Sequence, residues 1–243
     1  GMQSIMLQNE FAPCIGGQLD KLDLLYGLGV RHMGLTAQFP NHIAGGSNDR
    51  YDSGLSWFGI EVVQRMNELG IVIDLSHSTP KVVFDVLEVS KDPIIHNHIG
   101  AYGVHPGPLW QGRRVKSEKA KTDEEMKAIA EKGGVLCIQA IPDTLSGEKK
   151  QGIDDWLKHI DYTVRTVGID HVGIGTDACF EDIYEIHSKF QASGKMLFAP
   201  PRGTWVLQCP FFWGMENPTE WPNFVRALVS GGYSDQEIEK SIG

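Results

Sequence analysis

The sequence lacks the features that define several common classes of protein. None of its apolar stretches approaches the ~20 residues that a membrane-spanning helix needs. Its four cysteines are far apart and form no Cys-x-x-Cys pair, so we expect reduced thiols rather than a zinc knuckle or a disulfide framework. No positively charged stretch followed by an apolar segment opens the chain, so we expect no secretory signal and favour a cytoplasmic location.

Positive charge is also scarce. The chain has 22 Lys and Arg against 31 Asp and Glu, a formal net charge of −9, and such a chain repels phosphate backbones. We therefore expect no nucleic-acid partner. No Gly-x-Gly-x-x-Gly or P-loop pattern follows any expected strand, which weakens a nucleotide-binding hypothesis. What remains is a globular protein of 243 residues, 41% hydrophobic and long enough to bury a core.

The sequence does contain a repeated alternation of strand and helix patterns. Apolar positions at helical spacing fill residues 56–70, with Ser56 as a capping residue and Gly70 as a stop. A β-branched run follows at once and predicts a buried strand. By the same criteria, strands are expected at 5–8, 31–35, 71–75, 93–97, 134–139 and 171–175, and helices at 19–28, 56–70, 79–90, 122–132 and 153–167.

Six strands that alternate with helices predict a parallel α/β sheet covered by helices. Two arrangements remain open at this point, a (β/α)8 TIM-type barrel and an open, doubly wound sheet. The missing phosphate loop favours the barrel. Long connections at 38–53 and 100–121 would shape a binding face in such a fold.

Ionisable side chains gather at one end of the predicted sheet. Glu10, His77, His98 and Asp177 each lie just past the C-terminal end of a different strand, where parallel α/β folds build their sites. Two imidazoles and two carboxylates suit Zn²⁺, which makes hydroxide available near neutral pH. Each residue taken singly is more often a cap or a hydrogen-bonded loop residue, and His96 competes with His98, so the prediction depends on their joint position.

The run Ile73-Asp74-Leu75-Ser76-His77 and the helix before it form a specific pattern, accompanied by segments 29–36, 93–101 and 170–177. Together these segments resemble the membrane (renal) dipeptidase family of zinc metallopeptidases, and the resemblance extends over nearly the whole chain. It implies a (β/α)8 barrel that hydrolyses the peptide bond of dipeptides with water activated by two zinc ions.

The resemblance also implies roles for individual residues. Glu10 corresponds to the carboxylate that bridges the two metals, and His77 and His98 correspond to the histidines of the second metal. Asp177 corresponds to the aspartate that handles the proton of the attacking water.

The substrate-binding candidates lie in segment 105–114. Arg113 or Arg114 corresponds to the arginine that holds the substrate carboxylate, a task that suits a bidentate guanidinium. His105 opens the same segment and is a third candidate. Because the segment carries an insertion relative to the family, the choice between the arginines stays open.

Two further departures concern the metal site and the substrate. No His-x-Asp pair, which binds the other metal in the family, precedes Glu10, and Ala37 occupies the place of a substrate-polarising histidine. We therefore expect residues 1–243 to form a single barrel-type domain with about six of eight strands, holding one or two zinc ions. Exposed sheet edges would favour a homodimer. The alternatives are a related hydrolase acting on a lactone, ester or amide, and a non-catalytic barrel that binds a ligand.

Overall fold

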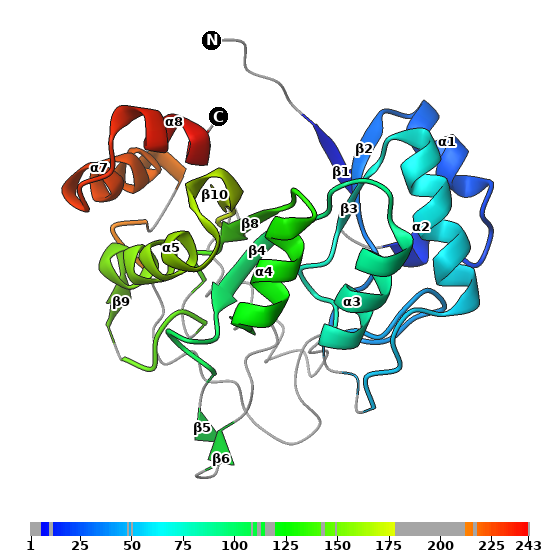
Figure 1. Ribbon diagram of the computed structural model, residues 1–243, viewed down its shortest axis with the longest axis horizontal. Helices are drawn as coiled ribbons and strands as arrows, with labels where there is room; N and C mark the ends of the chain where they lie inside the picture. The colour runs from blue at the N-terminus through cyan, green and yellow to red at the C-terminus, as the bar shows by residue number, and fades with distance from the viewer. Residues whose placement is uncertain are drawn as a thin grey trace, which may run out of the picture.

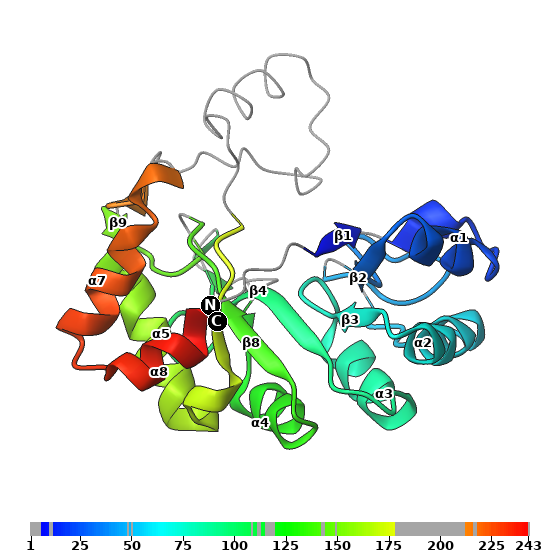
Figure 2. The same cartoon turned by 90° about the horizontal axis from the view of Figure 1, so that it is seen from above.

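A parallel sheet with helices on its outer side makes up most of the computed structural model (Figure 1, Figure 2). The structure describes residues 6–9, 12–47, 49, 51–107, 109–110, 113–114, 120–141, 144–148, 150–177, 212–215 and 218–242. The strands of the main sheet are β1 (Leu7–Asn9), β2 (Val30–Gly34), β3 (Val72–Asp74), β4 (Ile95–Ala101), β7 (Ala120–Lys121), β8 (Val135–Ile138) and β10 (Val172–Ile174).

The strand order follows the chain. Within the described residues the sheet has seven strands in the order β1-β2-β3-β4-β8-β10, with β7 paired to β4, and every pairing is parallel. Viewed from above, the strands form an inner arc and the helices an outer one (Figure 2). The arc does not close between β1 and β10 in this part of the chain. The predicted alternation of strands and helices is therefore confirmed.

The helices and smaller elements complete the fold. The α-helices are α1 (Lys21–Gly27), α2 (Trp57–Leu69), α3 (Pro80–Val89), α4 (Asp123–Glu131), α5 (Ile153–Val167), α7 (Pro222–Ser230) and α8 (Asp235–Ile242). Two small sheets pair β5 (Leu109–Trp110) with β6 (Arg113–Arg114), and β9 (Gln151–Gly152) with β11 (Phe212–Trp213). Short 3-10 helices span Ala12–Ile15, Ile169–His171 and Pro218–Glu220.

The helix boundaries follow the capping residues that the sequence predicts. Ser56 Oγ accepts a hydrogen bond from Gly59 N (2.9 Å) at the start of α2, and Gly70 ends this helix in the left-handed region at φ 72°. Thr79 caps α3, whose first residue is Pro80. Thr122 and Glu125 form a reciprocal capping box on α4. These local contacts determine where each helix begins, and the strand before a helix has to end upstream of that residue.

Strand β4 differs from the prediction. The sequence pattern predicts a strand that ends before His98, but β4 continues to Ala101, with an irregular register between His96 and Ile99. His98 therefore lies inside the strand rather than just past its end. The added length pairs Gly100 and Ala101 with β7, so β4 has partners beyond the point where the other strands stop.

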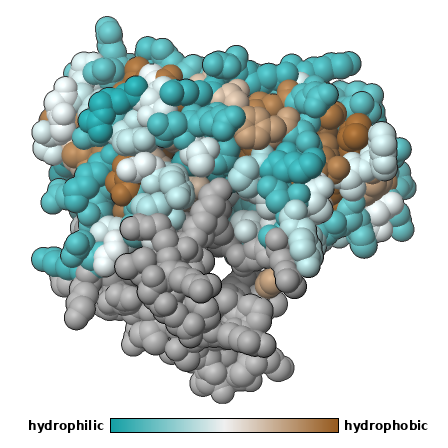
Figure 3. Space-filling model, turned by 60° about the horizontal axis from the view of Figure 1, so that its bottom comes forward, coloured by the Kyte–Doolittle hydropathy of each residue, from teal (hydrophilic) through white to brown (hydrophobic). Residues whose placement is uncertain are grey.

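The hydrophobic core lies between the sheet and its helices. It includes Met33 of β2, Ile73 of β3, Leu136 and Ile138 of β8, and Trp156 of α5, all 1% exposed or less. Hydrophilic residues predominate on the face of the described surface seen in Figure 3, with apolar residues in scattered groups. Among the helices in the described ranges, none combines the length and the apolar character needed to cross a bilayer.

Candidate functional site

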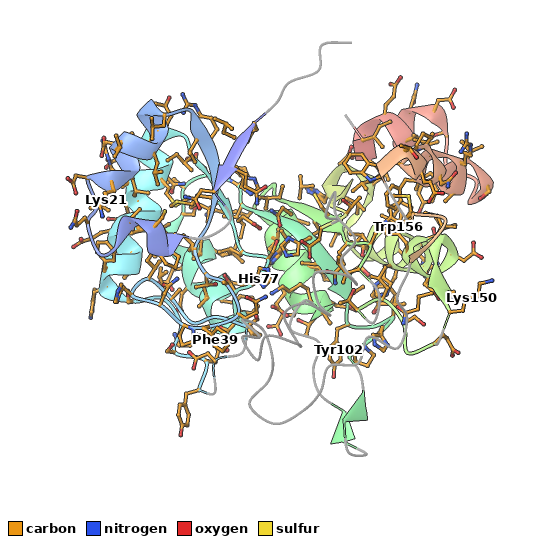
Figure 4. The ribbon with its side chains drawn as sticks, turned by 180° about the vertical axis from the view of Figure 1, so that it is seen from behind. Lys21, Phe39, His77, Tyr102, Lys150 and Trp156 are labelled. Atoms are coloured by element: carbon orange, nitrogen blue, oxygen red, sulfur yellow. The ribbon has the colours of Figure 1, made fainter. Side chains whose placement is uncertain are left out.

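Two histidines meet where the turn after β3 faces the middle of β4. His77 Nε2 and His98 Nε2 are 3.0 Å apart, and the rings pack edge to face with centroids 4.8 Å apart. Both side chains are buried, at 4% exposure each. Figure 4 shows His77 near the centre of the molecule, with Phe39 and Tyr102 of the loops after β2 and β4 on either side below it.

Of the two histidines of β4, His98 is the one whose ring contacts His77. His96 is fully buried, and this burial, followed by the charge of Lys121, holds the pKa of His96 well below its usual range. His98 Nδ1 faces Asn97 Oδ1 in a short hydrogen bond. With a proton on Nδ1, His98 Nε2 presents its lone pair towards His77.

Asp177 lies beside the same pair. Its Oδ2 is 3.9 Å from His98 Nε2, and its side chain is 28% exposed. The backbone of Asp177 is left-handed at φ 55°, an unfavourable conformation for a residue with a side chain and one that clusters at functional sites. Nearby, a Cβ on Gly175 would lie 1.7 Å from Asn97 O, so only glycine permits this close approach.

The turn that carries His77 is held from several sides. Thr36 Oγ1, after β2, lies 3.4 Å from His77 O and 3.3 Å from Ser78 Oγ. Lys121 Nζ, at the end of β7, donates to Ser78 O (2.9 Å). Lys121 is only 2% exposed, and its Nζ is 3.8 Å from Glu125 Oε1. The sequence reasoning missed Thr36 and Lys121, because their contacts join segments more than 40 residues apart.

A buried carboxylate lies beneath the histidines. Asp74 is 3% exposed, and burial raises the pKa of its carboxyl group, while the hydrogen bond from Ser76 and then the charge of His32 oppose the rise. His32 Nε2 lies 3.8 Å from Asp74 Oδ2. Burial lowers the pKa of His32, and Asp74 acts in the opposite direction. The strand pattern contained a signal for this position, because Asp74 interrupts an otherwise apolar strand.

The other predicted site residues are placed less completely. Glu10 lies outside the described residues, directly after β1. Arg113 and Arg114 together form strand β6, in a hairpin that projects below the sheet in Figure 1. Because both lie on this strand, the choice between them stays open. His105 lies on the turn after β4, where a Cβ on Gly147 would be 3.7 Å from its Cε1.

The histidine pair has the geometry of two ligands of one metal ion. Two nitrogens bound to a tetrahedral zinc at about 2.0–2.1 Å lie about 3.4 Å apart, close to the observed 3.0 Å. His98 Nδ1 also has an oxygen acceptor, Asn97 Oδ1, and the second ring nitrogen of a metal-binding histidine usually donates to an oxygen. Across the described ranges, no three His, Cys, Asp or Glu side chains form a metal-binding group. The pair fits the cation but needs a further ligand.

A further buried histidine, His159, supports the surrounding loops. His159 Nδ1 accepts from Ala101 N and His159 Nε2–H donates to Leu145 O, both at 2.8 Å. Burial, the largest cause, lowers the pKa of His159 from 6.5 to about 4. Between pH 4 and 6.5, His159 is therefore protonated in the unfolded chain and neutral in the folded chain. This histidine contributes its full stability above pH 6.5, and the contribution falls as the pH drops towards 4.

We expect this loss to reach about 3 kcal/mol of unfolding free energy. The measurement is urea unfolding as a function of pH, with the non-titrating variant His159→Gln as the comparison. The variant should be less stable at neutral pH and should lose less of its remaining stability in acid. Identical pH dependence in the two proteins would contradict the assignment.

Comparison with known proteins identifies relatives over most of the chain. Residues 2–191 match the sequence profile of the membrane dipeptidases, peptidase family M19. An uncharacterized dipeptidase of Schizosaccharomyces pombe is 34% identical over 73% of this chain and 42% of its own length. The dipeptidase TcpJ of Claviceps purpurea is 27% identical over 94% of this chain and 46% of its own length. The chain thus spans less than half the length of these curated relatives.

Solved structures share the fold. An amidohydrolase from Pseudomonas aeruginosa superposes with a TM-score of 0.80 at 27% identity, over 97% of this chain and 68% of that one. A metallo peptidase from Rhodobacter sphaeroides, liganded with a phosphinate mimic of the dipeptide L-Ala-D-Ala, gives 0.75 at 23% identity, over 97% and 59%. Together with the unclosed sheet, these likenesses confirm the predicted TIM-barrel-type α/β fold in incomplete form.

Proposed function

The chain belongs to the membrane dipeptidase family, peptidase family M19, and on that premise we propose that it takes part in zinc-dependent hydrolysis of dipeptides. The observation that supports this most directly is the 3.0 Å approach of His77 Nε2, on the turn after β3, to His98 Nε2, within the neighbouring parallel strand β4. Glu10, which follows β1, would supply the further ligand that the pair needs.

In the proposed reaction the protein side chains bind, orient and move protons. His77 and His98 would hold a zinc ion, which would supply Lewis acidity and lower the pKa of a water molecule. The Asp177 carboxylate, whose Oδ2 lies 3.9 Å from His98 Nε2, would accept a proton from the attacking water and pass it to the leaving amine. Arg113 or Arg114 would bind the substrate carboxylate, and His105 would line the same part of the site.

The experiment is a zinc titration of the purified chain followed by a dipeptide panel that includes L-Ala-D-Ala. Turnover that rises with zinc occupancy would support the proposal. Asp177→Asn should retain zinc but lose about 100-fold or more in kcat, the usual contribution of general acid–base catalysis. Zinc binding without any turnover at saturation would reject the hydrolase and leave a ligand-binding barrel.

A second candidate is hydrolysis of a lactone, ester or amide at the same site. It is favoured by the likeness to an amidohydrolase at a TM-score of 0.80 and by Ala37, which replaces the substrate-polarising histidine of the dipeptidases. A lactone and amide panel assayed beside the dipeptides separates the two candidates.

We also propose that residues 1–243 form one domain and that a second copy covers the open edges of the sheet. Strands β1 and β10 are the two edges of the described sheet, and exposed edges with unpaired backbone groups are usually covered. Met6 and Leu7 at the β1 edge are 54% and 56% exposed. A solution mass of two chains would support the homodimer, and a monomer would reject it.

A further inference from the structure

One oxygen of Asp74 joins the turn after β3 to β4, the two segments that carry the histidine pair. Asp74 Oδ1 accepts from Ser76 N at 3.1 Å, within its own turn after β3. The same oxygen accepts from Asn97 N of β4, also at 3.1 Å. The second bond connects residues 23 positions apart and fixes the offset between β3 and β4 at the level of the histidines.

Ser76 adds a second connection of the same kind. Ser76 Oγ lies 2.7 Å from both Asp74 Oδ1 and Asn97 Oδ1, so its single proton is shared between two acceptors. It also accepts from His98 N at 3.1 Å. Ser76 is 1% exposed, so no solvent competes for these bonds.

The consequence for His98 follows from the direction of these bonds. Because Ser76 Oγ approaches Asn97 Oδ1, the Asn97 side chain is held with its oxygen available to His98 Nδ1. That oxygen accepts a hydrogen bond from Nδ1–H, and with the proton on Nδ1 the neutral ring of His98 has an unprotonated Nε2. In the metal-free pair, Nε2–H of His77 then donates to Nε2 of His98.

We propose that Asp74 and Ser76 form a positioning clamp that sets the spacing of His77 and His98 and fixes the tautomer of His98. The bonds of both residues reach the backbone of Asn97 and His98, so both would act through the histidines. This inference deepens the proposed metal site and rests on it, although the tautomer of His98 can be measured without any metal.

The test compares Ser76→Ala with Ser90→Ala. Ser90 is the matched control, because it is also buried (2% exposed) and its Oγ makes two hydrogen bonds, to Asn67 Oδ1 at 3.2 Å and Asp92 O at 2.9 Å, in the turn after α3. Both variants should lose a similar amount of stability. Only Ser76→Ala should weaken zinc binding, by about 10–100-fold, the usual effect of removing an outer partner of a ligand.

Asp74 is tested by its own pair of variants. Asp74→Asn keeps an oxygen in the place of Oδ1 and should hold zinc affinity within about threefold, whereas Asp74→Ala should lose about 10–100-fold. Rescue by asparagine would assign the effect to the hydrogen bonds rather than to the charge. Equal losses in Asp74→Asn and Asp74→Ala would overturn the positioning role.

The last readout separates this inference from the proposed function. Nitrogen-15 NMR of the histidine rings, recorded on the metal-free proteins at alkaline pH, reports the tautomer of His98 directly. The wild-type and Ser90→Ala proteins should show the proton on Nδ1, and Ser76→Ala should show a mixture. An unchanged tautomer in Ser76→Ala overturns the clamp, whether or not the wild type binds zinc or hydrolyses a dipeptide.

Discussion

Replacing His98 by glutamine is expected to weaken zinc binding by more than about 100-fold and to remove dipeptide hydrolysis with it. Loss of an outer partner of a ligand costs about 10–100-fold, and loss of the ligand itself should exceed that range. Glutamine keeps a similar length and polarity but offers no imidazole nitrogen to face His77 Nε2. Competition with a chromophoric chelator measures the affinity, and kcat/KM on a dipeptide measures the activity.

His42→Gln is the matched control for this prediction. His42 is exposed and lies on the loop after β2, where its backbone oxygen, not its ring, accepts a hydrogen bond from Ser56 Oγ. The substitution should leave zinc affinity and stability unchanged. If His98→Gln retained wild-type affinity, the histidine pair would not be the metal site, and the family mechanism could not operate there.

The elements of the fold could be predicted because each one is specified by nearby residues. The start of α2 depends on Ser56 and its end on Gly70, and both cap contacts join residues within four positions along the chain. The same holds for the Thr122–Glu125 capping box of α4. Such contacts can be predicted from one short segment of sequence. The extension of β4 to Ala101 was missed because it depends on pairing with β7, which is distant in the sequence.

The candidate site could be predicted from the sequence only in part, because many of its contacts join residues that are distant along the chain. The spacing of strands predicted that His77 and His98 would lie side by side, and their Nε2 atoms are 3.0 Å apart. Asp177 also lies where the strand pattern placed it. The roles of Asp74 and Ser76 were not predicted, because their importance comes from bonds to Asn97 and His98 across the strands. Sequence periodicity indicates the strand near which a residue lies, but not the atoms that its side chain contacts.

Replacing Lys121 by methionine is expected to lower the unfolding free energy by about 3–5 kcal/mol. Lys121 and Glu125 are 2% and 1% exposed, so the substitution leaves a buried carboxylate without the cation 3.8 Å away. It also removes the donor to Ser78 O. Because Ser78 follows His77, the loss should reach the metal site as well as the stability. Urea unfolding measures the first effect and zinc competition the second.

Lys81→Met tests whether burial is the cause of this large effect. Lys81 and Asp85 form an ion pair of the same i,i+4 spacing at 2.8 Å, but the lysine is 54% exposed. Exposed pairs contribute at most about 1 kcal/mol, so this variant should be nearly as stable as the wild type. The double variant Lys121→Met/Glu125→Gln has no buried carboxylate left without a cation, so it should be more stable than Lys121→Met alone. Equal destabilisation by Lys121→Met and Lys81→Met would show that the buried ion pair contributes no more to the unfolding free energy than the exposed one. The turn that carries His77 would then depend on Thr36 and on the Asp74–Ser76 clamp.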